Sequence, residues 1–256
     1  QTYIENGSWG PRLDGSMQVY GPIWNNQQLI HEYSAKKDNV KDFFDPGWSQ
    51  NHTVSLSGVS ADTKMDYYLS YSFTKDDGIM PKDYDTYERN TVAFRGGYEA
   101  TNWLKVSSSL NFARSQTDAV GSFQGTSVID GVFELPRDIS IVDMKDTSSP
   151  FNTPEAYFTP YGITNPYWAL ENNYNHTASK QIYGKVQVDV TPIKELKLSY
   201  RMGFDYTDYD RKVGTPQINL DDALIDEDYG YAPSNMNQSG HVYTRYGRHY
   251  ELNHDF

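Results

Sequence analysis

The chain has 256 residues, enough for one large domain or two ordinary ones, and its formal net charge is -12. This acidic balance argues against nucleic acid as a partner, because the chain has no basic patch to neutralise phosphates. Cysteine is absent, which excludes disulfides and thiolate metal sites. The sequence contains no apolar run of about 18 residues, so a transmembrane helix is excluded by length.

Aromatic side chains are abundant although the chain is polar overall. Twenty-two Tyr, 11 Phe and 5 Trp make 15% of the residues aromatic, yet 37% are hydrophobic and the mean hydropathy is -0.74. Such a mixture is unusual for the core of a soluble domain. It is typical of strands whose side chains alternate between lipid and water.

The first 51 residues keep no period of two or 3.6, and we expect an extracellular loop over 1–51, with Gln27–Asn39 as a candidate short helix. From His52 onward, apolar and polar residues alternate within short runs. These runs come in pairs, which predicts hairpins. The runs are 52–59 and 67–74, 89–98 and 104–112, 180–190 and 195–207, and a last one from about 240.

The run Glu195–Thr207 has the clearest alternation. One parity holds Leu196, Leu198, Tyr200, Met202, Phe204 and Tyr206, and the other holds Lys197, Ser199, Arg201, Gly203, Asp205 and Thr207. A strand of this kind has an apolar face and a polar face, so it separates an apolar medium from an aqueous one. We therefore expect the apolar parity to face lipid and Lys197, Arg201 and Asp205 to point inward.

Short connections alternate with long ones along the chain. The short ones are 60–64, 99–102 and 191–194, and the long ones are 76–88, 114–179 and 208–239. This alternation predicts an all-β fold: a segment of a large antiparallel transmembrane β-barrel of about seven strands, with short periplasmic turns and long extracellular loops. The alternative is a soluble all-β carbohydrate-binding or adhesin domain, which would not depend on detergent.

One residue of the last run fits this pattern poorly. Arg248 has the parity of Val242, Tyr246 and Tyr250, and an Arg facing lipid at mid-depth costs about 2–4 kcal/mol. A bulge at Gly247 would remove the conflict, and so would a position above the bilayer. The sequence leaves both solutions open.

Four motifs stand in a characteristic order: WGPRLDG at Trp9–Gly15, FFDPGWSQNHTVSLSG from Phe43, YYLSYSFTKDDGIMPKDYDTYERN from Tyr67, and NPYWALENN at Asn165–Asn173. With them the sequence resembles the middle of the barrel of SusC/RagA-type TonB-dependent transporters. The resemblance implies that 1–256 is part of one TonB-dependent receptor β-barrel domain in the bacterial outer membrane. The plug and the TonB box are not among these residues, and we expect an internal piece of a longer polypeptide.

The resemblance also implies partners and a function. It implies energised uptake of oligosaccharides or oligopeptides through the TonB complex, and a SusD-like surface lipoprotein that acts as a lid on the barrel. The remaining barrel strands and the outer-membrane lipid would surround the chain. The family has no catalytic set, so the resemblance implies no enzyme activity and no cofactor.

Motif searches for catalytic and metal sites agree with this expectation. The six His form no HExxH, and the chain has no GxSxG, P-loop or GxGxxG. The acidic stretch 219–231 lacks the spacing and the central Gly of an EF-hand, so a solvated loop is favoured over a cation site.

Candidate ligand-binding residues come from two places. Loop aromatics with their neighbours are candidates because amphipathic rings stack on sugar faces, and charges of the inward parity are candidates because a solute in the lumen would meet them. These residues are Trp9, Arg12, Tyr167, Trp168, Arg201 and Asp205. Packing within the loops, or against a plug, is the competing interpretation for each of them.

The connection 114–179 is the expected site of function. Its apolar residues are numerous enough to fold, Val128, Val132 and Leu135 have helical spacing, and Asn165 before Pro166 resembles a helix N-cap. We expect an ordered extracellular element with short helices that lines the ligand space or docks the lid.

Overall fold

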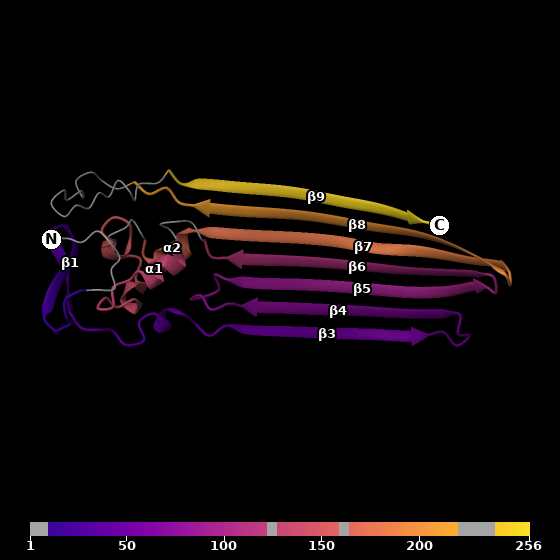
Figure 1. The fold of residues 1–256 in the computed structure, drawn as a ribbon, viewed down its shortest axis with the longest axis horizontal. Helices are drawn as coiled ribbons and strands as arrows, with labels where there is room; N and C mark the ends of the chain where they lie inside the picture. Colours follow the sequence, from indigo (N-terminus) through magenta and orange to yellow (C-terminus); the bar gives the residue numbers. More distant parts are fainter. Residues whose placement is uncertain (1–9, 122–126, 159–163, 220–238) are drawn as a thin grey trace.

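The computed structural model describes residues 10–121, 127–158, 164–219 and 239–256. In Figure 1 a long sheet fills most of the molecule, and the helices gather at one end of it. The strands of this antiparallel sheet follow one another in chain order: β3 (Trp48–Val59), β4 (Met65–Asp77), β5 (Thr86–Thr101), β6 (Leu104–Ala119), β7 (Tyr174–Ile193), β8 (Leu196–Thr215) and β9 (His241–Asp255). The sheet is not closed, and β3 and β9 are its edges.

The remaining described elements are short. They are β1 (Met17–Trp24) and β2 (Gln27–Glu32), the α-helices α1 (Val128–Phe133) and α2 (Pro166–Asn172), and the 3-10 helices η1 (Lys41–Phe43), η2 (Val142–Lys145) and η3 (Pro150–Asn152). None of the helices in the described ranges is long and apolar enough to cross a membrane.

The strand register arranges the side chains in rows, because directly opposite residues share a face of the sheet. The central row is apolar across all seven strands: Leu56, Leu69, Phe94, Leu110, Gly184, Phe204 and Leu252. The next row toward the long connections is Val54, Tyr71, Val92, Phe112, Ile182, Tyr206 and Tyr250. Toward the short turns, Met65, Tyr98, Val106, Val188 and Tyr200 form a row that contains two tyrosines.

These rows form an apolar band with tyrosines near both margins. Roughly five rows, two residues apart along tilted strands, span about 20–25 Å, the height of the lipid-facing band of a transmembrane barrel. The opposite face is polar, and one of its rows is Ser55, Ser70, Ala93, Asn111, Tyr183, Asp205 and Glu251. The all-β fold and the seven-stranded antiparallel sheet that the sequence predicts are confirmed.

The alternation predicted for Glu195–Thr207 is present in β8. Leu196 and Leu198 are 42% and 55% exposed on the apolar face, and no second sheet covers them in the described part of the chain. Arg201 and Asp205 lie on the polar face, directly opposite Gln187 and Tyr183 of β7.

The strands run further toward the long connections than their alternation predicts. The connections span 78–85, 120–173 and 216–240 instead of 76–88, 114–179 and 208–239. Beyond the apolar band both faces of a strand are polar, so the period of two disappears although the backbone pairing continues. The sequence boundaries were therefore wrong by several residues at these ends.

The first 51 residues also differ from the expectation of an irregular loop. β1 and β2 pair as an antiparallel hairpin joined at Asn25 and Asn26, which both have positive φ, 50° and 59°. Such a turn is typical of two-residue hairpin loops, where Asn tolerates the left-handed conformation. The helix expected at Gln27–Asn39 is thus wrong, because its first six residues form β2, and β3 already begins at Trp48.

The structure decides between the two solutions for Arg248. β8 and β9 pair in continuous register from Arg201 opposite Asp255 to Thr215 opposite His241, so the bulge at Gly247 is wrong. Arg248 lies opposite Asp208, in the first row beyond the tyrosines Tyr206 and Tyr250. It therefore has the parity of the apolar face but lies outside the apolar band.

Candidate functional site: a cap of packed loops at the end of the sheet

Three segments that are far apart in the sequence pack together at the long-connection end of the sheet, and we call the described residues of 36–47, 78–85 and 127–173 the loop cap. Phe43 and Met80 come from the first two segments and the other core residues come from the third. The buried core consists of Phe43, Met80, Val128, Val132, Ile139, Ile141, Met144, Tyr157, Tyr167, Ala169 and Leu170. The described residues of the long connection thus form an ordered element with short helices, as the sequence predicts.

Helix α1 begins and packs as the local sequence dictates. Its N-cap Ser127 accepts a hydrogen bond at Oγ from the backbone N–H of Asp130, and Val128 and Val132 are buried on one side of the helix. Gly131 allows a close approach to α2, because a Cβ there would lie 3.0 Å from the carbonyl oxygen of Thr164.

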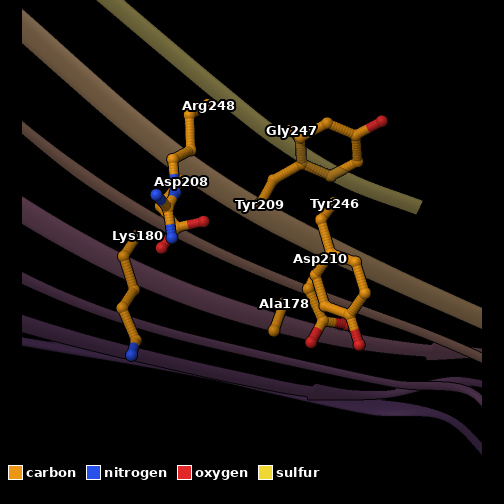
Figure 2. A pocket seen from close by; sticks show the side chains of 8 residues that line it. All are labelled: Ala178, Lys180, Asp208, Tyr209, Asp210, Tyr246, Gly247 and Arg248. Atoms are coloured by element: carbon orange, nitrogen blue, oxygen red, sulfur yellow. The ribbon is translucent and has the colours of Figure 1, made fainter. Parts of the chain in front are cut away.

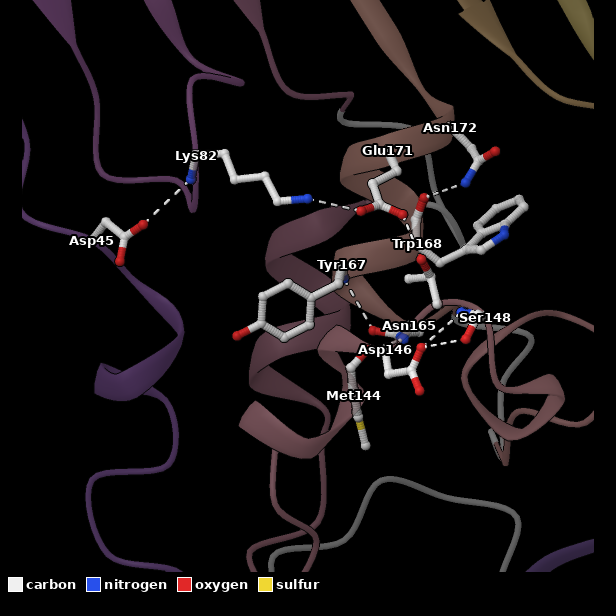
Figure 3. Close-up of polar contacts among 11 residues, drawn as sticks. Asp45, Lys82, Met144, Asp146, Ser148, Asn165, Tyr167, Trp168, Glu171 and Asn172 are labelled. Carbon is white, nitrogen blue, oxygen red and sulfur yellow. Dashed lines mark hydrogen bonds and ion pairs between the residues drawn. The ribbon is translucent and has the colours of Figure 1, made fainter.

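Asn165 joins three parts of the loop cap (Figure 3). Its Oδ1 accepts a hydrogen bond from the backbone N–H of Tyr167 at 3.0 Å, which caps α2, and Pro166 follows at the first helical position. Its Nδ2 donates to the carbonyl oxygens of Met144 and Asn152, both at 2.9 Å. Asn165 is 1% exposed, so these bonds are shielded from water.

A polar contact also joins α2 to the β4–β5 connection. Lys82 Nζ donates to Glu171 at 2.9 Å, and the backbone N–H of Lys82 donates to Asp45 at 3.3 Å (Figure 3). The other oxygen of Glu171 accepts from Thr147 Oγ1 at 2.7 Å. Burial raises the pKa of Glu171, but the hydrogen bonds from Thr147 and Lys82 outweigh it and hold that pKa below its ordinary value.

Tyr167 and Trp168, two predicted ligand-binding residues, are consecutive residues of α2. The ring of Tyr167 is buried against Phe43, with ring centroids 4.9 Å apart, and Lys145 Nζ lies 5.7 Å from its centroid. Burial, then the charges of Asp45 and Asp42, raise the pKa of Tyr167 to about 12. Trp168 is half-buried. The structure thus places Tyr167 in the core of the loop cap.

A cavity of about 610 Å³ lies between the β1–β2 hairpin and the loop cap. His31 Nε2 lies 2.5 Å from Asp138 Oδ2 at this boundary, and Tyr20 packs edge-on against the His31 ring. Burial, then Asp143 and Asp138, raise the pKa of Tyr20. The sequence offered no signal for the contact between His31 and Asp138, because the two residues are 107 positions apart.

The polar face of the sheet holds the two predicted charges of the inward parity. Arg201 Nε donates to Gln187 at 3.2 Å and Arg201 Nη1 lies 3.7 Å from Asp255, whereas Asp205 accepts from Gln181 at 2.8 Å. Arg201 and Asp205 are four positions apart on β8, so the structure does not bring them together.

The other predicted residues are more scattered. Arg12 is exposed near the start of the described chain, and Trp9 lies outside the described residues. The acidic stretch 219–231 lies outside them from residue 220 onward. Within the described ranges, no three His, Asp or Glu side chains are grouped as metal ligands.

A second cavity, of about 510 Å³, lies beside the end of the apolar band. It is lined by Ala178, Lys180, Asp208, Tyr209, Asp210, Tyr246, Gly247 and Arg248. Figure 2 shows the Lys180 and Tyr246 side chains on one side of the sheet and the Tyr209 ring on the other. Lys180, Asp208 and Arg248 thus place charges in the row just beyond the tyrosines of the apolar band.

The chain was compared with known proteins. Neither a protein-family model nor a curated protein matches it. Among solved structures it is similar to a chain of the RagAB peptide importer in the closed-closed state, with a TM-score of 0.56 and 20% identity, over 79% of this chain and 21% of that one. The open-open state gives a TM-score of 0.55 and 20% identity over 80% and 21%.

A third structure, of the RagAB peptide transporter, has a TM-score of 0.54 and 21% identity, over 74% of this chain and 21% of that one. This chain has the fold of part of a RagAB chain. It spans about a fifth of the length of the RagAB chains that it matches, 21% in each case. The fold that the motifs predict, a segment of a large antiparallel barrel sheet, agrees with this similarity.

Proposed function

We propose that the chain is part of a SusC/RagA-type barrel that imports oligopeptides or oligosaccharides across the bacterial outer membrane. In this proposal the TonB complex energises uptake through parts of the protein outside this chain, and a SusD-like lipoprotein covers the loop cap. The neighbours are described as peptide importers, which favours oligopeptides. The chain would have no enzymatic activity and would need no cofactor.

The observation that carries the proposal is the apolar band on one face of the sheet. Leucines, valines and phenylalanines fill its centre, tyrosines lie near both margins, and the opposite face is polar across all seven strands. A soluble domain would bury such a band under a second layer, and none covers it in the described ranges. Lipid on one side and water on the other satisfy both faces.

The loop cap supports the recognition role of the long connections. All the described long connections leave the sheet at one end, where two of them pack around a shared core (Figure 1). A cap with a buried core presents a defined surface to a solute or to a lid, at lower entropic cost than a mobile loop. In the proposal this surface lines the ligand space or docks the lipoprotein.

The test uses the complete transporter in its host, with the lipoprotein present. Cells are given fluorescent oligopeptides, and uptake is measured with and without an uncoupler and after deletion of 121–161. The proposal expects energised uptake in the wild type, and loss of uptake or of lipoprotein co-purification after deletion, with the barrel still in the membrane. Extraction of the wild-type protein without detergent, or uptake indifferent to both treatments, contradicts it.

A further inference from the structure

Two arginines face each other on the polar side of the sheet. Arg211 of β8 lies directly opposite Arg245 of β9 in continuous register, and both side chains are exposed. Directly opposite residues on antiparallel strands have Cβ atoms about 4.5–5.5 Å apart, and like charges at this distance destabilise the pair. Two facing arginines therefore lower the stability of the folded sheet unless an anion lies between their guanidinium groups.

Neutral groups hold both arginines in place. Arg211 Nε donates to Asn175 Oδ1 at 3.1 Å, which leaves its two terminal nitrogens for another acceptor. The Arg245 guanidinium carbon lies 5.6 Å from the centroid of the Tyr209 ring. Among the described residues, neither arginine has a carboxylate within 4.0 Å.

Tyr209 in turn has a defined position. Tyr209 lies directly opposite Gly247 of β9, and its ring crosses over this glycine (Figure 2). A Cβ atom added at position 247 would lie 2.2 Å from Tyr209 Cε1. Only glycine at 247 leaves room for the ring in this place. The glycine that the sequence suggested as a bulge therefore positions Tyr209 beneath Arg245.

Among the described residues, the rows around the arginine pair on this face of β6 to β9 contain no compensating acid. In its row the nearest neighbours are Thr177 and Thr117, and the adjacent row holds Ser179 and Ser115. The next acidic pair toward the short turns on this face is Asp205 opposite Glu251, six residues along the strands and about 20 Å away. This local positive charge stands out in a chain whose net charge is -12.

We propose that Arg211 and Arg245 bind a carboxylate of the transported solute, such as the C-terminal carboxylate of an oligopeptide. Two guanidinium groups present N–H donors in a planar geometry that matches the two oxygens of a carboxylate. The pair lies near the loop-cap ends of β8 and β9, so a solute that passes the loop cap meets it before Arg201. The inference rests on the proposed function and names a chemical group of its substrate.

The test uses the complete transporter in detergent and two labelled peptides of one sequence without acidic side chains, one with a free C-terminus and one amidated. The wild type should bind the free acid at least about tenfold more tightly, as expected for charge-assisted hydrogen bonds. The double variant R211Q/R245Q should lose this difference while its affinity for the amide stays unchanged. Heat-modifiable migration confirms that the variant barrel is folded.

R95Q is the matched control. Arg95 lies on the same polar face but on β5, where its guanidinium carbon is 6.0 Å from the centroid of the Tyr68 ring, so this variant should keep the preference for the free acid. Equal affinities of the wild type for both peptides would overturn the inference, and so would a preference that survives in R211Q/R245Q. If a carboxylate of the protein itself occupied the arginine pair, the wild type would bind the free acid and the amide with equal affinity. If the wild type imports neither peptide, the proposed function fails; if it imports both equally, only this inference fails.

Discussion

Glu171, in α2, lies 2.9 Å from the ammonium group of Lys82, and this contact joins segments that are 89 residues apart. Because the folded-state pKa of Glu171 is lowered, its contribution to stability is present above the ordinary value of 4.5 and is lost as the pH falls through the folded-state value.

The first prediction follows from this contact. At about pH 6, Glu171→Gln should weaken the loop cap by about 0.5 kcal/mol, because Lys82 is exposed and its ion pair is screened. The difference between the variant and the wild type should shrink as the pH falls below 4.5 and through the lowered folded-state pKa of Glu171. Hydrogen exchange of residues 166–172 in the detergent-solubilised complete protein measures the difference, and an effect that does not depend on pH would refute the argument.

The second prediction concerns Asn165. Asn165→Ala should destabilise the loop cap by about 2–4 kcal/mol, because it removes a helix cap and the donor to one buried and one partly buried carbonyl oxygen. The measurement is the rate of limited proteolysis within 127–158 in the complete protein. Asn172→Ala, at the exposed end of the same helix, is the control and should change this rate little.

The third prediction separates packing from hydrogen bonding at Tyr167. The hydroxyl of Tyr167 is buried and has no hydrogen-bond partner among the described residues. Tyr167→Phe should therefore leave the stability of the loop cap unchanged or raise it by about 1 kcal/mol. Tyr167→Ala should cost about 3–5 kcal/mol, because it leaves a cavity beside Phe43. The same proteolysis assay ranks the variants. A Phe variant as labile as the Ala variant would indicate a role for the hydroxyl.

The fourth prediction tests the apolar band. Phe204→Arg places a charge in the central row and should cost about 2–4 kcal/mol of barrel stability in lipid. Thr207→Arg, on the polar face of the same strand, should cost much less. Folded fractions in outer-membrane preparations, read from heat-modifiable migration, give the comparison. Equal losses in both variants would mean that the apolar face does not contact lipid.

Much of this architecture is determined by local sequence. A period of two decides which residues share a face, so the strands through Leu69, Phe94 and Phe204 and their order could be predicted before any contact was known. Capping is local as well, and Asn165 begins α2 where the Asn–Pro pattern places it. Where both faces are polar, as at the ends of β6, β7 and β8, the pattern disappears and the strand ends were missed.

The tertiary structure alone decided which distant residues meet. Phe43, Met80 and Tyr167 form one core, and His31 reaches Asp138, because the sheet brings the ends of its strands to the same place. The arginine pair depends on register: a shift of one residue between β8 and β9 would separate Arg211 from Arg245 and move Gly247 away from Tyr209. Backbone pairing over the whole length of the two strands sets that register, and no short stretch of sequence contains it.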